Sequence, residues 1–175
     1  MKKCALALLA VTALAGCSSH YSGQSFALSE NDAVVLMPLV NHSTTPLAGE
    51  KAEDILRSLW IQQGNTALTV YPRGTAANDG LPDLDDQKRY ERVRGWLAQQ
   101  SASYYLSGSV SEWRYKSGLS GEPTVGLTVN LHRTSDDQVV WSATGARSGW
   151  DRESLSGTAQ KVMAKILSDI EMETE

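Results

Sequence analysis

The stretch from Tyr104 to Trp150 constrains the fold most, because it holds three successive runs in which apolar and polar residues alternate. A period of two is typical of strands with one buried face. The runs are separated by turn residues at 116–123 and at 135–137. The sequence therefore predicts an antiparallel three-strand meander. Its inward residues are Tyr104, Leu106, Gly108, Val110, Val125, Leu127, Val129, Leu131, Val139, Trp141 and Ala143, with Trp113 as a further core residue.

The rest of the chain supplies two more strands and three helices. Apolar runs at 33–39 and 66–71 predict strands, the first buried on both faces. Helical spacing predicts helices over 46–63, with Thr45 as N-cap, over 83–100, and from about 151 to 170, capped by Ser148 or Asp151. The order β-α-β-α-β-β-β-α indicates an α+β fold in which helices cover one sheet in two or three layers.

The N-terminus has the pattern of a secretory signal peptide over residues 1–16. Lys2 and Lys3 form a basic start, and an apolar segment too short to span a bilayer follows. The sequence Leu14-Ala15-Gly16-Cys17 resembles the bacterial lipobox, which implies cleavage before Cys17 and acylation of that residue. By the same resemblance, Ser18 favours the outer membrane. An ordinary signal peptide with an incidental cysteine is the alternative.

Residues 17–31 are polar and are expected to form a lipidated flexible tether to a single domain over 32–175. Without the leader, 14 basic and 20 acidic residues give a net charge of −6. Such a chain attracts cations, and its lack of a basic stripe argues against nucleic acid as a partner. Once Cys17 is acylated, no thiol remains for a disulfide or a metal site.

Motifs for catalysis are absent from the sequence. The three histidines, His20, His42 and His132, are scattered, and His132 lies at an outward strand position that predicts a surface side chain. There is no Gly-x-Ser-x-Gly elbow and no phosphate-binding loop. We therefore expect a protein that is not an enzyme and uses no cofactor or metal.

Two segments of the meander resemble the PelC family of outer-membrane lipoproteins in Pel exopolysaccharide export. They are residues 112–123, which read EWRYKSGLSGEP, and residues 140–150, which read VWSATGARSGW. The resemblance extends over about 33–170. It implies a fold similar to the N-terminal domain of TolB and a dodecameric ring of identical subunits under the outer membrane. It also implies a PelB-like barrel as partner and a cationic amino-sugar polymer, a biofilm matrix component, as cargo.

The resemblance also suggests functional residues. The family has an Asp in the loop position where this chain has Ser120, so Glu122 is the first candidate for an acidic residue that faces the polysaccharide. Asp136 and Asp137 are further candidates, and each of the three is alternatively an ordinary turn carboxylate. Arg147 and Trp150 correspond to a corner that faces the membrane in the family, where an indole beside a cation suits the lipid interface. Packing of Trp150 over the last helix is the alternative.

Two other functions remain open from the sequence. The first is an LpoB-like lipoprotein activator of a peptidoglycan synthase, which would need a long tether. The one predicted here would reach roughly 45 Å. The second is a hydrolase that acts on a glycan through surface carboxylates such as Glu122.

Overall fold

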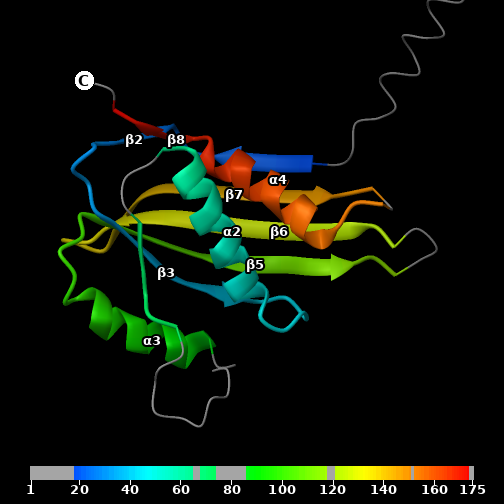
Figure 1. Ribbon diagram of the computed structural model, residues 1–175, viewed down its shortest axis with the longest axis horizontal. Coiled ribbons are helices and arrows are strands. Elements are labelled where there is room, and N and C mark those ends of the chain that lie inside the picture. Colours follow the sequence, from blue (N-terminus) through cyan, green and yellow to red (C-terminus); the bar gives the residue numbers. More distant parts are fainter. Residues whose placement is uncertain (1–17, 65–67, 74–85, 118–120, 151, 174–175) are drawn as a thin grey trace, which may run out of the picture.

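The computed structural model describes residues 18–64, 68–73, 86–117, 121–150 and 152–173. Within them, β5 (Tyr104–Tyr115), β6 (Pro123–Arg133) and β7 (Gln138–Ser148) are consecutive antiparallel strands (Figure 1). The turn between β6 and β7 covers 134–137. The predicted meander is confirmed.

The meander is the middle of a six-stranded sheet with the order β1-β7-β6-β5-β3-β4. β3 (Val34–Asn41) runs parallel to both β5 and β4 (Leu68–Val70), and β1 (Ser18–Ser22) runs antiparallel to β7. A second sheet consists of β2 (Phe26–Leu28) and β8 (Ile170–Met172), paired in parallel. The predicted α+β class is confirmed, and β1, β2 and β8 are additions to the predicted order.

Helices lie on both faces of the sheet. α2 (Ala48–Gln62) and α4 (Leu155–Leu167) cover one face, and α3 (Asp86–Leu97) lies against β3 on the other (Figure 1). Val34 and Leu36 belong to the larger core under α2 and α4, whereas Val35 and Met37 pack with α3. This arrangement confirms that the strand predicted at 33–39 is buried on both faces.

A register shift between Val110 and Glu112 places Trp113 in the same core as Val110, although three positions separate them. Trp113 and Trp141 are both buried, as predicted. A strict period of two cannot place Trp113, because the extra residue of a bulge reverses the side-chain parity.

The predicted helix ends need correction. α2 begins at Ala48 after Leu47, whose φ is 59°, and Leu47 provides no side-chain cap. Thr45 is not the N-cap, because its hydroxyl donates to the carbonyl oxygen of Trp113. α4 starts after Ser154, whose hydroxyl accepts the Gly157 N–H at 3.0 Å, so neither Ser148 nor Asp151 caps it.

Two further boundaries differ from the prediction. Ile170 is the first residue of β8 and does not extend α4. α3 ends at Leu97, before the predicted residue 100, and the predicted start at Asp83 falls outside the described residues.

The flexible tether predicted for 17–31 is wrong for most of the described part of that segment. Ser18–Ser22 pair with β7, and Phe26–Leu28 pair with β8. Leu28 is fully buried, and the Phe26 ring meets Tyr104 edge-on at 5.5 Å. The edge of β7 offers backbone hydrogen bonds that a polar strand can use without an apolar pattern. The signal peptide and Cys17 lie outside the described residues, and within the described ranges no helix has the length and apolar character to cross a membrane.

Two glycines test the packing of the meander. A Cβ at Gly108 would lie 2.1 Å from the backbone oxygen of Thr128, whereas a Cβ at Gly95 in α3 would meet nothing within 4 Å. We expect Gly108→Ala to lower the free energy of unfolding by about 3 kcal/mol, because backbone must move. Gly95→Ala should raise it by about 0.5–1 kcal/mol through helix propensity. Urea denaturation of both variants measures this, and equal effects would contradict the register described for β5 and β6.

Candidate functional site

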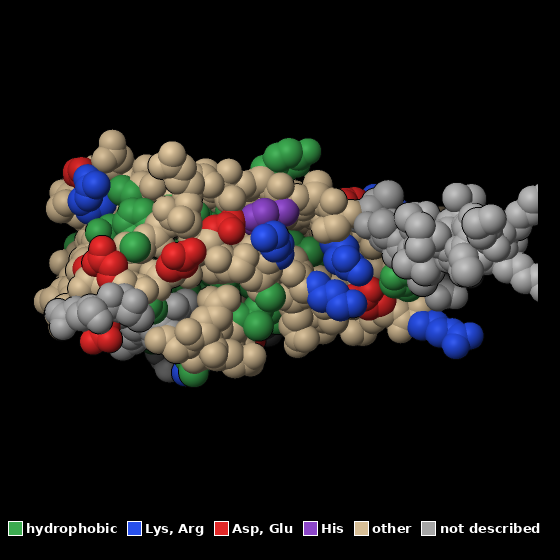
Figure 2. All heavy atoms as spheres, turned by 90° about the horizontal axis from the view of Figure 1, so that it is seen from above, with side chains coloured by type: hydrophobic (Ala, Val, Ile, Leu, Met, Phe, Trp, Pro, Cys, Tyr) green, Lys and Arg blue, Asp and Glu red, His purple; other side chains and the backbone are tan. Residues whose placement is uncertain are grey.

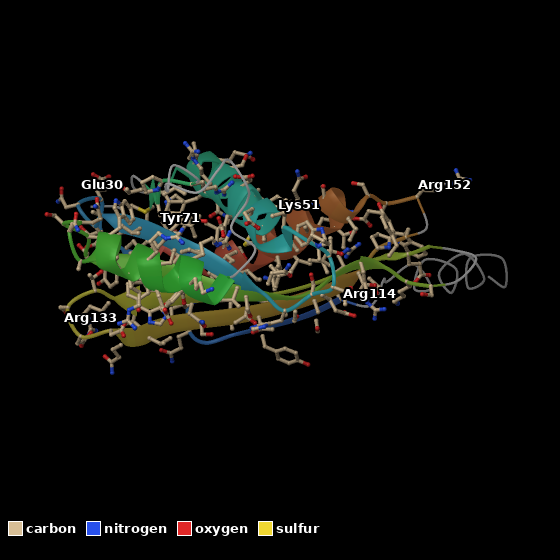
Figure 3. The ribbon with its side chains drawn as sticks, turned by 90° about the horizontal axis from the view of Figure 1, so that it is seen from below. Glu30, Lys51, Tyr71, Arg114, Arg133 and Arg152 are labelled. Carbon is tan, nitrogen blue, oxygen red and sulfur yellow. The ribbon has the colours of Figure 1, made fainter. Side chains whose placement is uncertain are left out.

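The strands of the meander give the molecule two ends. At the first, which we call the anchor end, Ser18 lies opposite Arg147, and Ser148 lies opposite Thr124 at the start of β6. At the second, the turn end, β6 and β7 are joined by residues 134–137. Figure 3 shows Arg114 and Arg152 at the anchor end and Arg133 and Glu30 at the turn end. β6 has 11 residues, which separates the two ends by about 35 Å.

The anchor end holds the residues expected to face the membrane. Ser18 directly follows Cys17 and is the first residue of β1. Trp150, two residues beyond β7, has 49% of its surface exposed. Its backbone carbonyl accepts the Glu153 N–H at 2.9 Å. The exposed indole and the first strand after the lipidation candidate thus lie at the same end of the molecule.

Arg147, the second residue expected to face the membrane, is partly exposed and has a carboxylate nearby. Its side chain is 21% exposed, and Nη2 lies 3.9 Å from the Glu153 carboxylate. Lys161 lies 2.8 Å from the same carboxylate. The hydrogen bond from Lys161 holds the pKa of Glu153 below its usual value. Arg147 therefore ties the end of β7 to the start of α4.

β1 is held to the rest of the fold by a side-chain pair. Nε2 of His20 lies 2.7 Å from the carboxylate of Asp169, the residue before β8. Burial of Asp169 raises its pKa, whereas contacts with Ser22 and His20 and the charge of Lys165 lower it. The net effect is a pKa below the ordinary value. This contact links the first strand to the C-terminal part of the chain.

Glu122, the first acidic candidate, also lies at the anchor end. Its carboxylate is 3.4 Å from Lys116, and the Lys116 N–H donates to the Glu122 carbonyl at 2.7 Å. Ser120 lies outside the described residues. Glu122 is thus a paired carboxylate directly before β6, which β7 separates from β1.

Asp136 and Asp137 lie together at the turn end, far from Glu122. Burial slightly opposes ionisation of Asp136, but the Gln138 N–H and the Arg133 guanidinium, 2.8 Å away, lower its pKa. Asp137 has a φ of 60° and lies 3.3 Å from Arg94. The structure therefore brings two of the three acidic candidates together and separates the third.

His132 is not the surface histidine predicted from its strand parity. Its ring stacks on Tyr105 with centroids 4.4 Å apart, and Nε2 lies 2.8 Å from the Ser107 hydroxyl. Tyr105 donates its hydroxyl proton to Asp137, and burial with this bond raises the pKa of Tyr105. His132 lies between a serine hydroxyl, Ser107, and a carboxylate, Asp137, which is the arrangement of contacts in a catalytic triad. However, 4.0 Å separates Nδ1 from the carboxylate and Ser107 is 8% exposed. The cluster instead holds the turn in place.

The turn end also holds carboxylates that the sequence analysis did not identify as candidates. In Figure 2 acidic side chains predominate in the left half, toward the turn end, and basic ones in the right half. β8, the last strand, also lies at the left in Figure 1. The sequence predicts a tether around Glu30, whose position follows from the pairing of β2 with β8. Acidic residues that strand pairing, contacts or Figure 3 place at this end include Glu30, Asp32, Asp136, Asp137, Glu171 and Glu173, and Arg94 and Arg133 lie there as partners of Asp137 and Asp136.

A buried ionic network fixes α2 against β3. Glu53 is fully buried and accepts the Leu39 N–H at 2.9 Å. Arg89 and Arg73 lie 3.2 and 3.1 Å from its carboxylate oxygens. Burial raises the pKa of Glu53, while Arg89 and the Leu39 N–H act in the opposite direction. Removing one member would leave a buried charge without compensation, so the network is structural.

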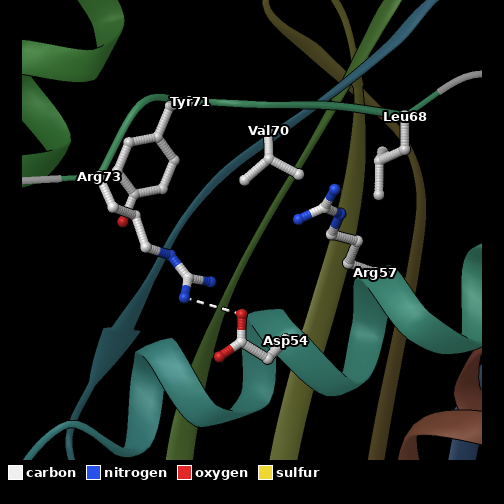
Figure 4. Close-up of a pocket in the computed structure, with 6 residues that line it drawn as sticks. All are labelled: Asp54, Arg57, Leu68, Val70, Tyr71 and Arg73. Atoms are coloured by element: carbon white, nitrogen blue, oxygen red, sulfur yellow. Dashed lines mark ion pairs between the residues drawn. The ribbon is translucent and has the colours of Figure 1, made fainter.

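Next to this network, α2 and the β4 segment enclose a pocket of about 330 Å³ (Figure 4). Arg73 points to Asp54, 2.7 Å away, and Arg57 reaches toward Val70 from the next turn of α2. The pocket is therefore lined mostly by cationic and apolar groups. Its residues are Asp54, Arg57, Leu68, Val70, Tyr71 and Arg73.

Comparisons with known proteins identify relatives of this fold. No family model matches the chain, and no curated protein matches it. The chain is similar to a PelC dodecamer from Paraburkholderia phytofirmans (space group P6), with 34% sequence identity and a TM-score of 0.75 over 90% of this chain and 100% of that one. A point variant of that dodecamer in space group C2 gives a TM-score of 0.76 at the same identity and coverage. Lipoprotein GNA1162 from Neisseria meningitidis, at 14% identity, 78% and 96% coverage and a TM-score of 0.53, shares the fold.

The contact between His20 and Asp169 predicts a pH dependence. Because the pKa of Asp169 is lowered, its stabilising effect is present above the ordinary value of 3.8 and is lost as the pH falls through the folded value. We expect Asp169→Asn to lower the free energy of unfolding by about 0.5–1 kcal/mol at neutral pH. At a pH below the folded pKa of Asp169 the variant and the original chain should converge. Denaturant titrations at several pH values test this, and a difference that persists in acid would contradict it.

Proposed function

The chain belongs to the PelC family, and on that premise we propose that it is an outer-membrane lipoprotein of exopolysaccharide export. Identical subunits would form a ring on the periplasmic face of the membrane, next to an export barrel. The ring would guide a cationic amino-sugar polymer toward the pore without a catalytic step. The observation that carries this proposal is the concentration of carboxylates at the end opposite the anchor.

The orientation follows from the position of β1. If Cys17 is acylated, its lipid chains begin one residue before Ser18, which is already paired with β7. The anchor end must then lie against the membrane, with the exposed indole of Trp150 at headgroup level. The turn end would project into the periplasm by the length of the strands.

The charge distribution suits the cargo. A chain without its leader has a net charge of −6, and a ring multiplies that charge around a common axis. Asp136, with its lowered pKa, stays ionised at any periplasmic pH. A field from several carboxylates concentrates a polycation while each contact stays weak, which movement of a polymer requires. Asp136 and Asp137 are better placed for this role than Glu122, which would face the membrane.

The absence of a tether weighs against the alternative of a peptidoglycan-synthase activator. That function requires the domain to reach through the periplasm from its lipid. Here β1 takes up residues 18–22 and β2 takes up 26–28, so little chain is left to extend. A domain held at the membrane suits a ring around an export pore.

Lipidation at Cys17 can be tested directly. Cys17→Ala should abolish acylation, so the intact mass should lose the diacylglycerol and amide-linked acyl groups and the protein should leave the outer-membrane fraction. The replacement of Ser18 by Ala is the matched control and should change neither property. An unchanged mass for Cys17→Ala would contradict the proposal.

Binding of a cationic polymer tests the role of the turn end. We expect Asp136→Asn combined with Asp137→Asn to weaken binding of partially deacetylated chitosan to the assembled protein about threefold to tenfold at low salt. Asn tolerates the positive φ of Asp137, so the turn should remain intact. Glu122→Gln, with one charge removed at the anchor end, is the control. If Glu122→Gln weakens binding as much, the polymer does not select the turn end.

A further inference from the structure

One arginine of the pocket beside α2 has no partner among the residues that the structure describes. Arg73 is paired with Asp54 and Glu53, and Arg89 is paired with Glu50 and Glu53. Arg57, by contrast, makes neither a hydrogen bond nor an ion pair with any described residue. In Figure 4 its guanidinium reaches over the pocket toward Val70 and away from Asp54. A cation held at the mouth of a pocket is positioned for an anionic group from outside.

The exposed side of α2 continues this surface. Ile61, one helical turn after Arg57, has 62% of its surface exposed. Leu68 and Val70 of β4 form the apolar wall of the pocket on the other side. An exposed branched aliphatic next to an unpaired guanidinium and an apolar wall is typical of a protein contact with an arginine at its edge.

The charge of the pocket limits what can occupy it. Asp54 and Glu53 both pair with Arg73, which leaves the Arg57 guanidinium as the cation of the pocket lining without a described counter-ion. A cationic polymer would be repelled there. The chain itself offers the opposite charge, since acidic residues exceed basic ones by 20 to 14 once the leader is removed. A subunit with this surplus can supply a carboxylate to its neighbour.

We propose that this pocket receives a carboxylate from a second copy of this chain, so that Arg57 makes an ion pair across the interface between subunits. The inference rests on the proposed ring and names one of its contacts. It accounts for an arginine that has no partner among the described residues, although Arg73 and Arg89 nearby each pair with two carboxylates. In a closed ring each subunit would offer its pocket to one neighbour and a carboxylate to the other.

Charge reversal at Arg57 tests the contact. Arg57→Glu should weaken association of the lipidated, full-length subunits at least about tenfold, as measured by sedimentation in detergent at several concentrations. Lys51→Glu is the matched control, because Lys51 is an exposed cation on the same helix outside the pocket. It should assemble like the original chain. Far-ultraviolet circular dichroism and thermal unfolding of Arg57→Glu should match the original, since Arg57 has no described contact to lose.

A cross-linking experiment identifies the source of the carboxylate. Arg57→Lys keeps the charge and adds an amine that a carbodiimide can couple to a touching carboxylate. When light and heavy isotope-labelled subunits are mixed before assembly, mass spectrometry should find cross-linked peptides that combine the two labels. Cross-links confined to one label would mean that the partner is in the same chain and would overturn the inference.

The remaining outcomes are also decisive. If Arg57→Glu assembles like the original chain, or if inorganic phosphate saturates the pocket of assembled protein without competing with association, the pocket is not the subunit contact. If the original chain stays monomeric at every concentration, the proposed ring itself fails. That outcome is distinct from loss of assembly in Arg57→Glu alone.

Discussion

The pairing of β1 with β7 determines how the whole molecule can be placed. Five residues, Ser18–Ser22, lie antiparallel to Ala143–Arg147, and the contact between His20 and Asp169 holds them from the other side. Because this strand starts directly after Cys17, the chain has no free segment between the lipidation candidate and the sheet. An acyl chain attached there would fix one end of the domain at the bilayer, whereas a tether would leave every orientation accessible.

Once one end is fixed at the bilayer, the charged groups of the domain have a defined position relative to the membrane. At the anchor end basic side chains predominate, and ion pairs such as that of Lys116 with Glu122 and that of Arg147 with Glu153 offset part of their charge. At the turn end carboxylates outnumber guanidiniums, and Asp137 is held by the buried hydroxyl of Tyr105. A rigid sheet of this length maintains the separation of charge. The field at the far end then adds up over every subunit of a ring, which is a collective property that one subunit does not show.

The sequence predicted the parts of the fold that depend on burial. Alternation in the meander and the apolar run at 33–39 identified the sheet and its two-sided strand, because burying those side chains is the main driving force. It failed where backbone hydrogen bonds alone hold a segment. Ser18–Ser22 contain no apolar pattern, yet they form an edge strand. The cap of α2 was missed for a similar reason, since the Thr45 hydroxyl bonds to a carbonyl 68 positions away.

Of the candidate site, Asp136 and Asp137 could be grouped from sequence, but the distance to Glu122 follows only from the strand direction. That Arg57 has no partner within the described part of the chain depends on long-range contacts, which no local pattern encodes.

The central claim is that the domain stands at the membrane with its turn end pointing away from it. The most direct test measures the distance from the bilayer surface to a label at Ser135, by fluorescence transfer to labelled lipid in nanodiscs that contain the lipidated protein. The account predicts one narrow distribution centred about 35 Å or more from the headgroups, and a label at Trp150 within contact of them. A broad distribution for Ser135, or a position of Ser135 at the headgroups, would contradict it.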